Sequence, residues 1–276
     1  LTVRVKVYRF LYILVNGLYW TDFKGEPKLL SEKYEASVNY YDNAVYFIDD
    51  ESHIQKVDLK DNKAETVVKS NVSSILIIDD IMYYIQQMGE NMHSLFGLEL
   101  KTRKVKELAS GVDMEYLYDC WGFAGVIIQE KNQLAICSYA GGIEQKQDIL
   151  ENQSLVGFLP DRSIIYSEAA DEGDEIGIYC KKDFTDTNPK LLIEKENIHH
   201  IILHKDEMVF TVLNQNGPIE VYQYDFQTEK CNKIGNTNYD ISDFNEEYVV
   251  SCYDDAIGVV NLIERKTGKC IPMSDQ

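Results

Sequence analysis

Positive charge is scarce in this sequence of 276 residues, which has 27 lysines and arginines against 46 aspartates and glutamates. The formal net charge is therefore −19. A surface this acidic repels phosphate backbones and anionic lipid headgroups. We therefore expect neither a nucleic acid nor a membrane surface as a partner, and solubility is the simplest interpretation of the charge.

Long apolar runs are also missing, because no stretch approaches the ~20 residues that a membrane helix requires. The opening segment, residues 1–15, mixes basic residues with a short apolar run and lacks a small-residue cleavage site, so we interpret it as a strand rather than a signal peptide. We expect no direct membrane insertion from this chain. Because the sequence starts at Leu1 and not at methionine, a leader, an anchor or another domain ahead of it is left open.

Signatures of catalysis and of cofactor binding are absent from the sequence. The six cysteines form no CxxC pair, which favours scattered buried thiols over a metal or redox site. There is no G-x-S-x-G elbow, P-loop, dinucleotide glycine fingerprint or HExxH motif. We therefore predict no catalytic residues and no cofactor, and the compartment is not fixed by cysteine usage.

Short runs of tyrosine, valine and isoleucine are what the sequence does contain. It has 19 tyrosines against 5 prolines, a balance that favours strands over helices. Segments starting at Ala44, Ile81, Glu207 and Glu247 share one pattern: an apolar strand, a polar gap, a second apolar strand ending near an acidic residue, a tight turn and a third strand. One more apolar run precedes each segment, so the repeat has four strands, which we label A to D in chain order.

Turn-forming residues recur with a period of about 40 residues, which is typical of a β-propeller blade. The turn after strand A holds Asp42, Asp79, Asp119, Asp161, Asp206 and Asn245. Strand C ends near Asp22, Asp58, Glu99, Ser138, Asp183, Asp225 and Glu264. Blades are expected to begin near Glu35, Val72, Met114, Ser154, Ile198 and Tyr239, after an N-terminal blade whose strand A is short or missing.

We therefore predict an all-β chain in which residues 1–276 form a single β-propeller domain of seven four-stranded blades. Six blades are the alternative count. A pair of β-sandwiches or an irregular β-solenoid would not require so regular a four-strand period.

The segments Asp79–Tyr84 with Leu98–Thr102, and Val45–Phe47 with Val57–Lys60, carry a family resemblance. They resemble bacterial β-propeller domains of unknown function, which are distantly similar to the YWTD propellers of lipoprotein receptors. The likeness covers nearly the whole chain through short apolar motifs. It implies the propeller fold and favours an extracellular or cell-envelope location over the cytoplasm. The literal Tyr19–Asp22 match to YWTD falls in strand C rather than in strand B, so we interpret it as chance, with a structural tryptophan.

Three histidines close in the sequence, His199, His200 and His204, raise the question of a metal site. On a regular strand His200 and His204 share one face about 13 Å apart, from a rise of ~3.3 Å per residue, which is too far for one zinc ion. His199 and His200 are expected on opposite faces. We therefore predict packed or solvated histidines and no metal site. The acidic run 171–175 lacks the ligand spacing of a calcium loop, so a solvated loop is expected there and a weak Ca²⁺ site is the less favoured hypothesis.

The D–A and B–C connections of a propeller share one face around the mouth of its channel, where ligands are expected. The candidate ligand-binding residues from the B–C connections are Met88, Glu90, Asn91, Asp171, Glu172, Asp174, Asn214 and Asn216. Arg103 and Arg265 are expected in C–D turns and Arg162 in an A–B turn, on the opposite face, which disfavours a sialidase-like clamp on a substrate carboxylate.

Two functions are compatible with these observations. The favoured one is a non-catalytic module that recognises a protein or a glycan through the loop face, because no complete catalytic set of residues is visible. The alternative is a propeller-type hydrolase or lyase whose acid and base come from different blades. Fold analogy alone does not decide between them.

Overall fold

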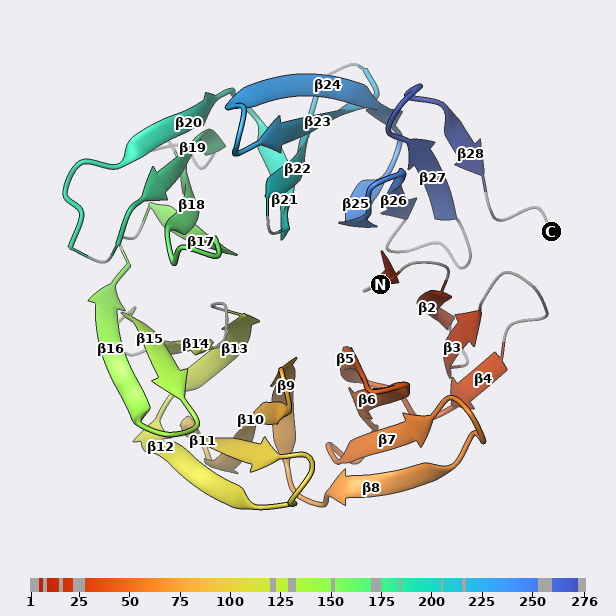
Figure 1. Cartoon of the computed structure of the whole chain (residues 1–276), viewed down its shortest axis with the longest axis vertical. Coiled ribbons are helices and arrows are strands. Elements are labelled where there is room, and N and C mark those ends of the chain that lie inside the picture. Colours follow the sequence, from red (N-terminus) through yellow and green to blue (C-terminus); the bar gives the residue numbers. More distant parts are fainter. Residues whose placement is uncertain are drawn as a thin grey trace. The chain divides into compact units, whose positions relative to one another are not determined.

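The computed structural model describes the chain except for residues 1–4, 7–8, 15–16, 22–27, 120–122, 129–132, 150–151, 170–174, 184, 205, 215–216, 253–259 and 273–276. Every regular element in the described part is a β-strand, and none is a helix long and apolar enough to cross a membrane. The strands form seven four-stranded antiparallel sheets (Figure 1). The chain divides into unit 1, Leu1–Glu32 with Asn152–Gln276, and unit 2, Lys33–Glu151.

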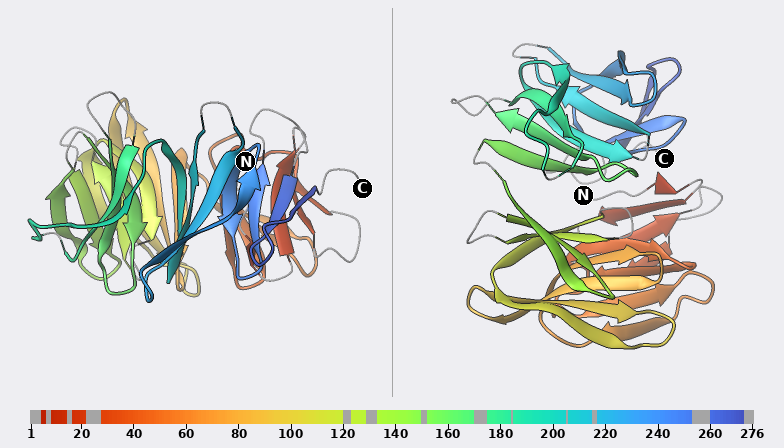
Figure 2. Two further views of the ribbon diagram at one scale, coloured as in Figure 1. Left: turned by 90° about the horizontal axis from the view of Figure 1, so that it is seen from above. Right: turned by 60° about the vertical axis from the view of Figure 1, so that its left-hand side comes forward.

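Unit 2 contains three sheets, and in each of them the strands pair in sequence order. The first sheet is β5 (Ala36–Tyr41), β6 (Ala44–Ile48), β7 (Ile54–Asp58) and β8 (Ala64–Val68). The second is β9 (Val72–Ile78), β10 (Ile81–Gly89), β11 (Met92–Glu99) and β12 (Val105–Val112). The third is β13 (Met114–Asp119), β14 (Ala124–Ile128), β15 (Gln133–Ser138) and β16 (Gly142–Asp148). Figure 2 shows the three sheets, from orange to green, stacked face to face.

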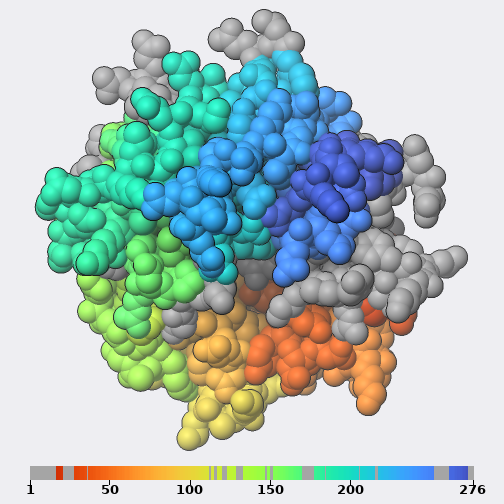
Figure 3. All heavy atoms as spheres, turned by 45° about the horizontal axis from the view of Figure 1, so that its top comes forward, coloured from red at the N-terminus to blue at the C-terminus, as the bar shows by residue number. Residues whose placement is uncertain are grey.

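Unit 1 contains four sheets of the same kind. The N-terminal one is β1 (Val5–Lys6), β2 (Arg9–Leu14), β3 (Gly17–Thr21) and β4 (Lys28–Ser31). The next two are β17 (Gln153–Phe158), β18 (Ile164–Ala169), β19 (Glu175–Lys181) and β20 (Lys190–Glu194), then β21 (Ile198–His204), β22 (Glu207–Val212), β23 (Ile219–Asp225) and β24 (Lys230–Thr237). The last is β25 (Asp240–Phe244), β26 (Tyr248–Cys252), β27 (Val260–Glu264) and β28 (Cys270–Pro272). β24 contacts β27 and β28, and Figure 3 shows the two sheets, in two shades of blue, side by side.

The predicted fold class is confirmed: the chain is all-β and forms a β-propeller. Each expected blade start falls within one residue of the start of β5, β9, β13, β17, β21 or β25. The arrangement is that of a six-bladed propeller, which was the alternative count. The described strands nevertheless form seven four-stranded sheets. The N-terminal sheet differs from the other six because its strand A, β1, has only two residues.

A β-bulge between strands A and B recurs in the six sheets that follow the N-terminal one. In each sheet the pairing register shifts by one residue within strand A. In β21, for example, His199 pairs with Thr211 and Ile201 with Phe210, so His200 is the extra residue. A bulge bends its strand, increases the local twist and interrupts the alternation of side chains. The repeat therefore carries a structural feature that its apolar pattern does not display.

The cores lie between consecutive sheets of each unit, and strands B such as β6 and β14 bury both of their faces. Phe210 and Ile178 belong to the core between the sheets β17–β20 and β21–β24, whereas Val209 and Phe244 belong to the core between β21–β24 and β25–β28. Cross-strand aromatic pairs recur between strands B and C, with ring centroids 5.2–5.4 Å apart, as in Phe210–Tyr222. Such pairs stabilise antiparallel sheets.

Candidate functional site

A cavity of about 420 Å³ opens at the start of two neighbouring A strands of unit 1, β17 and β21. It is lined by Ser154, Leu155, Val156, Ser167, Asn197, Ile198, His199, His200, Ile201 and Leu213. Asn197 belongs to a D–A connection and Leu213 to a B–C connection. The cavity therefore lies at the end of these sheets where the sequence predicts a ligand.

The rim of the cavity is fixed by the backbone. The amide of Leu213 donates a 3.0 Å hydrogen bond to the carbonyl of Asn197, which ties the B–C connection to the D–A connection. Asn197 has a φ of 57°, a left-handed conformation that asparagine tolerates better than most residues. The lining thus combines an ordered backbone with hydroxyl, amide and imidazole groups and with exposed apolar surface at Leu213. This mixture suits a polar ligand with apolar parts.

The bulge in β21 overturns the prediction that His199 and His200 point to opposite faces. Both imidazoles contact the same carboxylate, that of Asp240 on β25. The reason is that His200 is inserted between two regular pairs, so alternation breaks at this residue. The two rings meet edge to face with their centroids 4.4 Å apart.

The three side chains form a compact polar cluster. His199 Nδ1 lies 3.3 Å from one carboxylate oxygen of Asp240, and His200 Nε2 lies 3.1 Å from the other. One ligand atom from each residue lies within 4.8 Å of the other two, which is a geometry able to hold a metal ion. The side chains are each 40–45% exposed, so the cluster is open to solvent.

Each of the other three histidines also lies beside a carboxylate. His204, at the opposite end of β21, lies 3.2 Å from Asp243 and stacks on Phe244. In unit 2, His93 lies 3.1 Å from Asp113 and His53 lies 3.8 Å from Asp49. None of these three pairs brings in a second histidine among the described residues, so the sharing of Asp240 distinguishes the cluster in unit 1.

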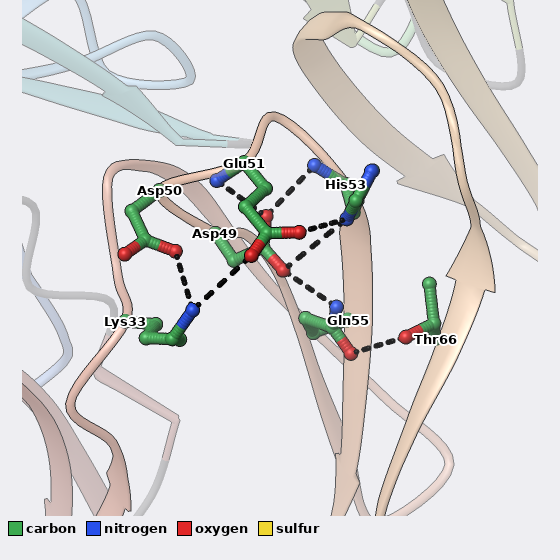
Figure 4. A network of polar contacts seen from close by, with 7 residues as sticks. All are labelled: Lys33, Asp49, Asp50, Glu51, His53, Gln55 and Thr66. Atoms are coloured by element: carbon green, nitrogen blue, oxygen red, sulfur yellow. Dashed lines mark hydrogen bonds and ion pairs between the residues drawn. The ribbon is translucent and has the colours of Figure 1, made fainter.

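Asp49 organises the connection between β6 and β7 (Figure 4). One carboxylate oxygen accepts hydrogen bonds from the amides of Glu51 and His53, and the other accepts one from Gln55 Nε2 at 2.6 Å. Burial by itself would raise the pKa of Asp49, but these hydrogen bonds outweigh it and lower the pKa below its ordinary value. The carboxylate is engaged by the chain itself, so we assign this network to the structure of the connection.

The structure places the predicted ligand-binding residues of unit 2 in a tight hairpin rather than in a long loop. Met88 lies inside β10, whereas Glu90 and Asn91 form a two-residue turn before β11. Asn91 has a φ of 53°, as expected for such a turn. Met88 is 56% exposed, one of the most exposed apolar side chains in the described part of the chain.

The remaining predicted ligand-binding residues are in unit 1. Asp171, Glu172, Asp174 and Asn216 lie outside the described residues. Asn214 follows Leu213 at the rim of the cavity, where its amide nitrogen donates a hydrogen bond to the carbonyl of Pro218. Sequence reasoning did not single out the cavity-lining residues Ser154, Ser167 and Asn197, because short polar residues at strand ends carry no distinctive signal.

Two of the arginines, Arg103 and Arg265, bind carboxylates of the chain. Arg103 and Arg265 lie in C–D turns and Arg162 in an A–B turn, as predicted. Arg103 contacts Glu65 and Arg265 contacts Glu207. These two guanidinium groups connect neighbouring sheets.

The comparisons with known proteins concern the fold. No protein-family profile matches the sequence, and a search of the curated proteins gives no match. Among solved structures, an oligogalacturonate lyase from Vibrio parahaemolyticus is similar at 12% identity and a TM-score of 0.59, over 93% of this chain and 82% of that one. The β-propeller domain of the Trilobed protease from Pyrococcus furiosus is similar at 12% identity and a TM-score of 0.65, over 88% of this chain and 86% of that one.

An acylaminoacyl peptidase from Pyrococcus horikoshii is also similar, with 12% identity and a TM-score of 0.69, over 99% of this chain. This chain spans only 52% of that peptidase. At these identities the likeness establishes the β-propeller fold alone.

Proposed function

We propose that this chain is a non-catalytic recognition module that binds a protein or a glycan at the D–A and B–C end of its sheets. The observation that carries the proposal is the cavity between β17 and β21. Its lining offers hydroxyl, amide and imidazole groups beside apolar surface, a combination that orients a polar ligand through a few directional hydrogen bonds.

The partners of the histidines support recognition over nucleophilic catalysis. A serine or cysteine nucleophile is commonly activated by a histidine base, which must lie within hydrogen-bond reach of it. The ion-pair geometry around His199, His200 and His204 directs imidazole nitrogens toward Asp240 and Asp243. The thiol of Cys137 is buried, and burial raises its pKa to about 12, which opposes formation of a nucleophilic thiolate.

The alternative function is that of a propeller-type hydrolase or lyase. It is favoured by the similarity to an oligogalacturonate lyase and to acylaminoacyl peptidases. In that case the acid and the base would come from histidine–carboxylate pairs such as His200–Asp240. Turnover distinguishes the two functions, because a recognition module releases its ligand unchanged.

The proposal is tested by screening arrays of glycans and of peptides with the wild-type protein and two matched variants. Ser154→Trp places an indole at the exposed lining position of the cavity, whereas Ser110→Trp places one on the exposed surface of β12. We expect Ser154→Trp to weaken binding of the captured compound at least about tenfold, which is about 1.4 kcal/mol, and Ser110→Trp to leave it unchanged.

Two results would count against the proposal. Equal affinity of Ser154→Trp and Ser110→Trp for the captured compound would show that the compound does not bind in the cavity. Conversion of a bound oligosaccharide or peptide into products by the wild-type protein, with loss of turnover in His200→Asn, would establish the alternative.

A further inference from the structure

The cluster of His199, His200 and Asp240 has a chemistry that ligand recognition does not require. Two imidazoles and one carboxylate converge from β21 and β25, and the three ligand atoms lie within 4.8 Å of one another. A solvated surface histidine needs no such convergence. Here two consecutive histidines share one acidic partner only because a bulge turns both toward the neighbouring sheet.

The backbone that presents the two histidines is anchored on both sides. Ile198, immediately before them, is 4% exposed in the core shared with the sheet β17–β20. Ile202, two residues after them, packs into the core shared with the sheet β25–β28. The same bulge recurs in five other sheets, so it belongs to the repeat and does not depend on the histidines. The cluster is therefore preorganised on rigid strands.

The distances approach those of a zinc site. Zinc–nitrogen and zinc–oxygen bonds are about 2.0–2.2 Å, so ligand atoms at two corners of a tetrahedron lie about 3.4 Å apart. Each nitrogen lies near this distance from one oxygen of Asp240, His199 Nδ1 at 3.3 Å from one and His200 Nε2 at 3.1 Å from the other, and one ligand atom from each residue lies within 4.8 Å of the other two. Because all three side chains are partly exposed, small rotations about their χ angles can bring the two nitrogens together without disturbing the core.

The donor set selects the class of metal. Calcium and magnesium prefer shells made entirely of oxygen, whereas imidazole suits zinc and other late first-row ions. Two neutral imidazoles with one carboxylate leave a doubly charged ion with a net charge of +1. The acidic surface of the chain, with a formal charge of −19, raises the local concentration of cations.

We propose that His199, His200 and Asp240 form a binding site for one zinc-class divalent transition-metal ion. A tetrahedral ion on these three ligands keeps one further position for water or a ligand oxygen, and both histidines also line the cavity between β17 and β21. This inference goes beyond the proposed recognition function, and metal binding itself does not depend on that function.

The test is a calorimetric titration of the metal-free protein with ZnCl₂, and with CoCl₂ followed by visible absorption. We expect one zinc per wild-type chain, with a dissociation constant below about 100 μM. His200→Asn and Asp240→Asn should each weaken zinc at least about tenfold, because each removes a ligand. Cobalt should give the ligand-field bands of a four-coordinate or five-coordinate ion, and Asp240→Asn should need at least about tenfold more cobalt to develop them.

His204→Asn is the matched control, because it removes a histidine of the same strand that lies beside another carboxylate, Asp243. Its zinc affinity should stay within about twofold of that of the wild-type protein. Circular dichroism and the metal-free melting temperature establish that each variant is folded. Asp240→Asn keeps the volume of the side chain, so it tests the site even where a histidine variant does not fold.

Three outcomes would overturn the proposal. The first is an absence of zinc binding by the wild-type protein up to about 1 mM. The second is an equal loss of affinity in His204→Asn and His200→Asn. The third is zinc binding that survives in Asp240→Asn and His200→Asn but is lost when the exposed Cys231 and Cys270 are replaced by serine.

Discussion

Arg265 binds both carboxylate oxygens of Glu207, and the pair joins the last two sheets of the chain. Glu207 begins β22, whereas Arg265 follows β27 in a C–D turn. The guanidinium group also donates to the carbonyl of Asn245 and lies 5.5 Å from the ring centroid of Phe244. Because it is bidentate and mostly buried, this ion pair should contribute more to the free energy of unfolding than an ordinary surface pair.

Replacing Arg265 with alanine should lower the free energy of unfolding by about 2 kcal/mol, because hydrogen bonds to charged groups contribute ~1.5–3 kcal/mol when they are partly buried. The side chains of Arg265 and Glu207 are 10% and 23% exposed. Arg103→Ala is the control, since Arg103 and Glu65 join two sheets of unit 2 at 47% and 49% exposure. It should cost less than about 0.5 kcal/mol. Urea denaturation measures both, and equal costs would contradict this assignment.

Asn39 connects the first two sheets of unit 2 through the backbone of β9. Its side chain donates a 3.1 Å hydrogen bond to the carbonyl of Ile75 and accepts one of 3.1 Å from the amide of Ile77. Asn39→Ala should destabilise the protein by about 2–4 kcal/mol, because two backbone groups lose their partner in a buried setting. Asn71→Ala removes an exposed hydrogen bond to Gln87 and should change stability by less than about 0.5 kcal/mol. Equal shifts of the urea midpoint in Asn39→Ala and Asn71→Ala would show that the two hydrogen bonds of Asn39 do not contribute to stability.

The lowered pKa of Asp49 predicts an acid-dependent contribution to stability. Between the folded and the unfolded pKa the unfolded chain binds more protons, so stability rises with pH there. The contribution is full above the ordinary aspartate pKa of 3.8 and is lost as the pH falls through the lower folded value. Urea midpoints of the wild-type protein and Asp49→Asn should therefore differ at pH 6 and converge as the pH falls below about 4. A difference that is independent of pH would show that the network of Figure 4 does not depend on the charge of Asp49.

Two glycines with similar positive φ values allow the backbone strain of an alanine substitution to be distinguished from steric overlap of its Cβ. Gly111 and Gly268 have φ values of 73° and 70°. A Cβ at Gly111 would meet nothing within 4 Å, whereas one at Gly268 would lie 2.6 Å from the carbonyl oxygen of Ile234. Gly111→Ala should therefore cost about 1–2 kcal/mol from left-handed strain alone, and Gly268→Ala should cost distinctly more. Equal thermal destabilisation of the two variants would contradict the close approach of β24 to the turn before β28.

The period of turn residues was sufficient to predict the strands. Asp58, Glu99, Asp225 and Glu264 each end a strand C, because an acidic side chain there can accept hydrogen bonds from the turn that follows. An N-terminal sheet whose strand A is short or missing was also predicted, and β1 has two residues. The family-level resemblance to YWTD propellers stays a prediction, because only the fold is supported by the structural comparisons.

The candidate site was harder to predict, because it depends on breaks in the pattern. Simple alternation separates His199 from His200, and only the bulge brings them together. A bulge leaves no mark in the hydrophobic period, since the residue that it inserts varies from serine in β9 to valine in β17. Asp240 was unremarkable in the sequence because its partners are some 40 residues away, in the preceding repeat.

The most direct measurement is a crystal structure of the wild-type protein grown with zinc, with anomalous data collected at the zinc edge. We predict one strong anomalous peak about 2.0–2.2 Å from an imidazole nitrogen of His199, one of His200 and a carboxylate oxygen of Asp240, beside the cavity between β17 and β21. A map that places the two histidines on opposite faces of β21, or shows zinc only at other residues, would contradict the account.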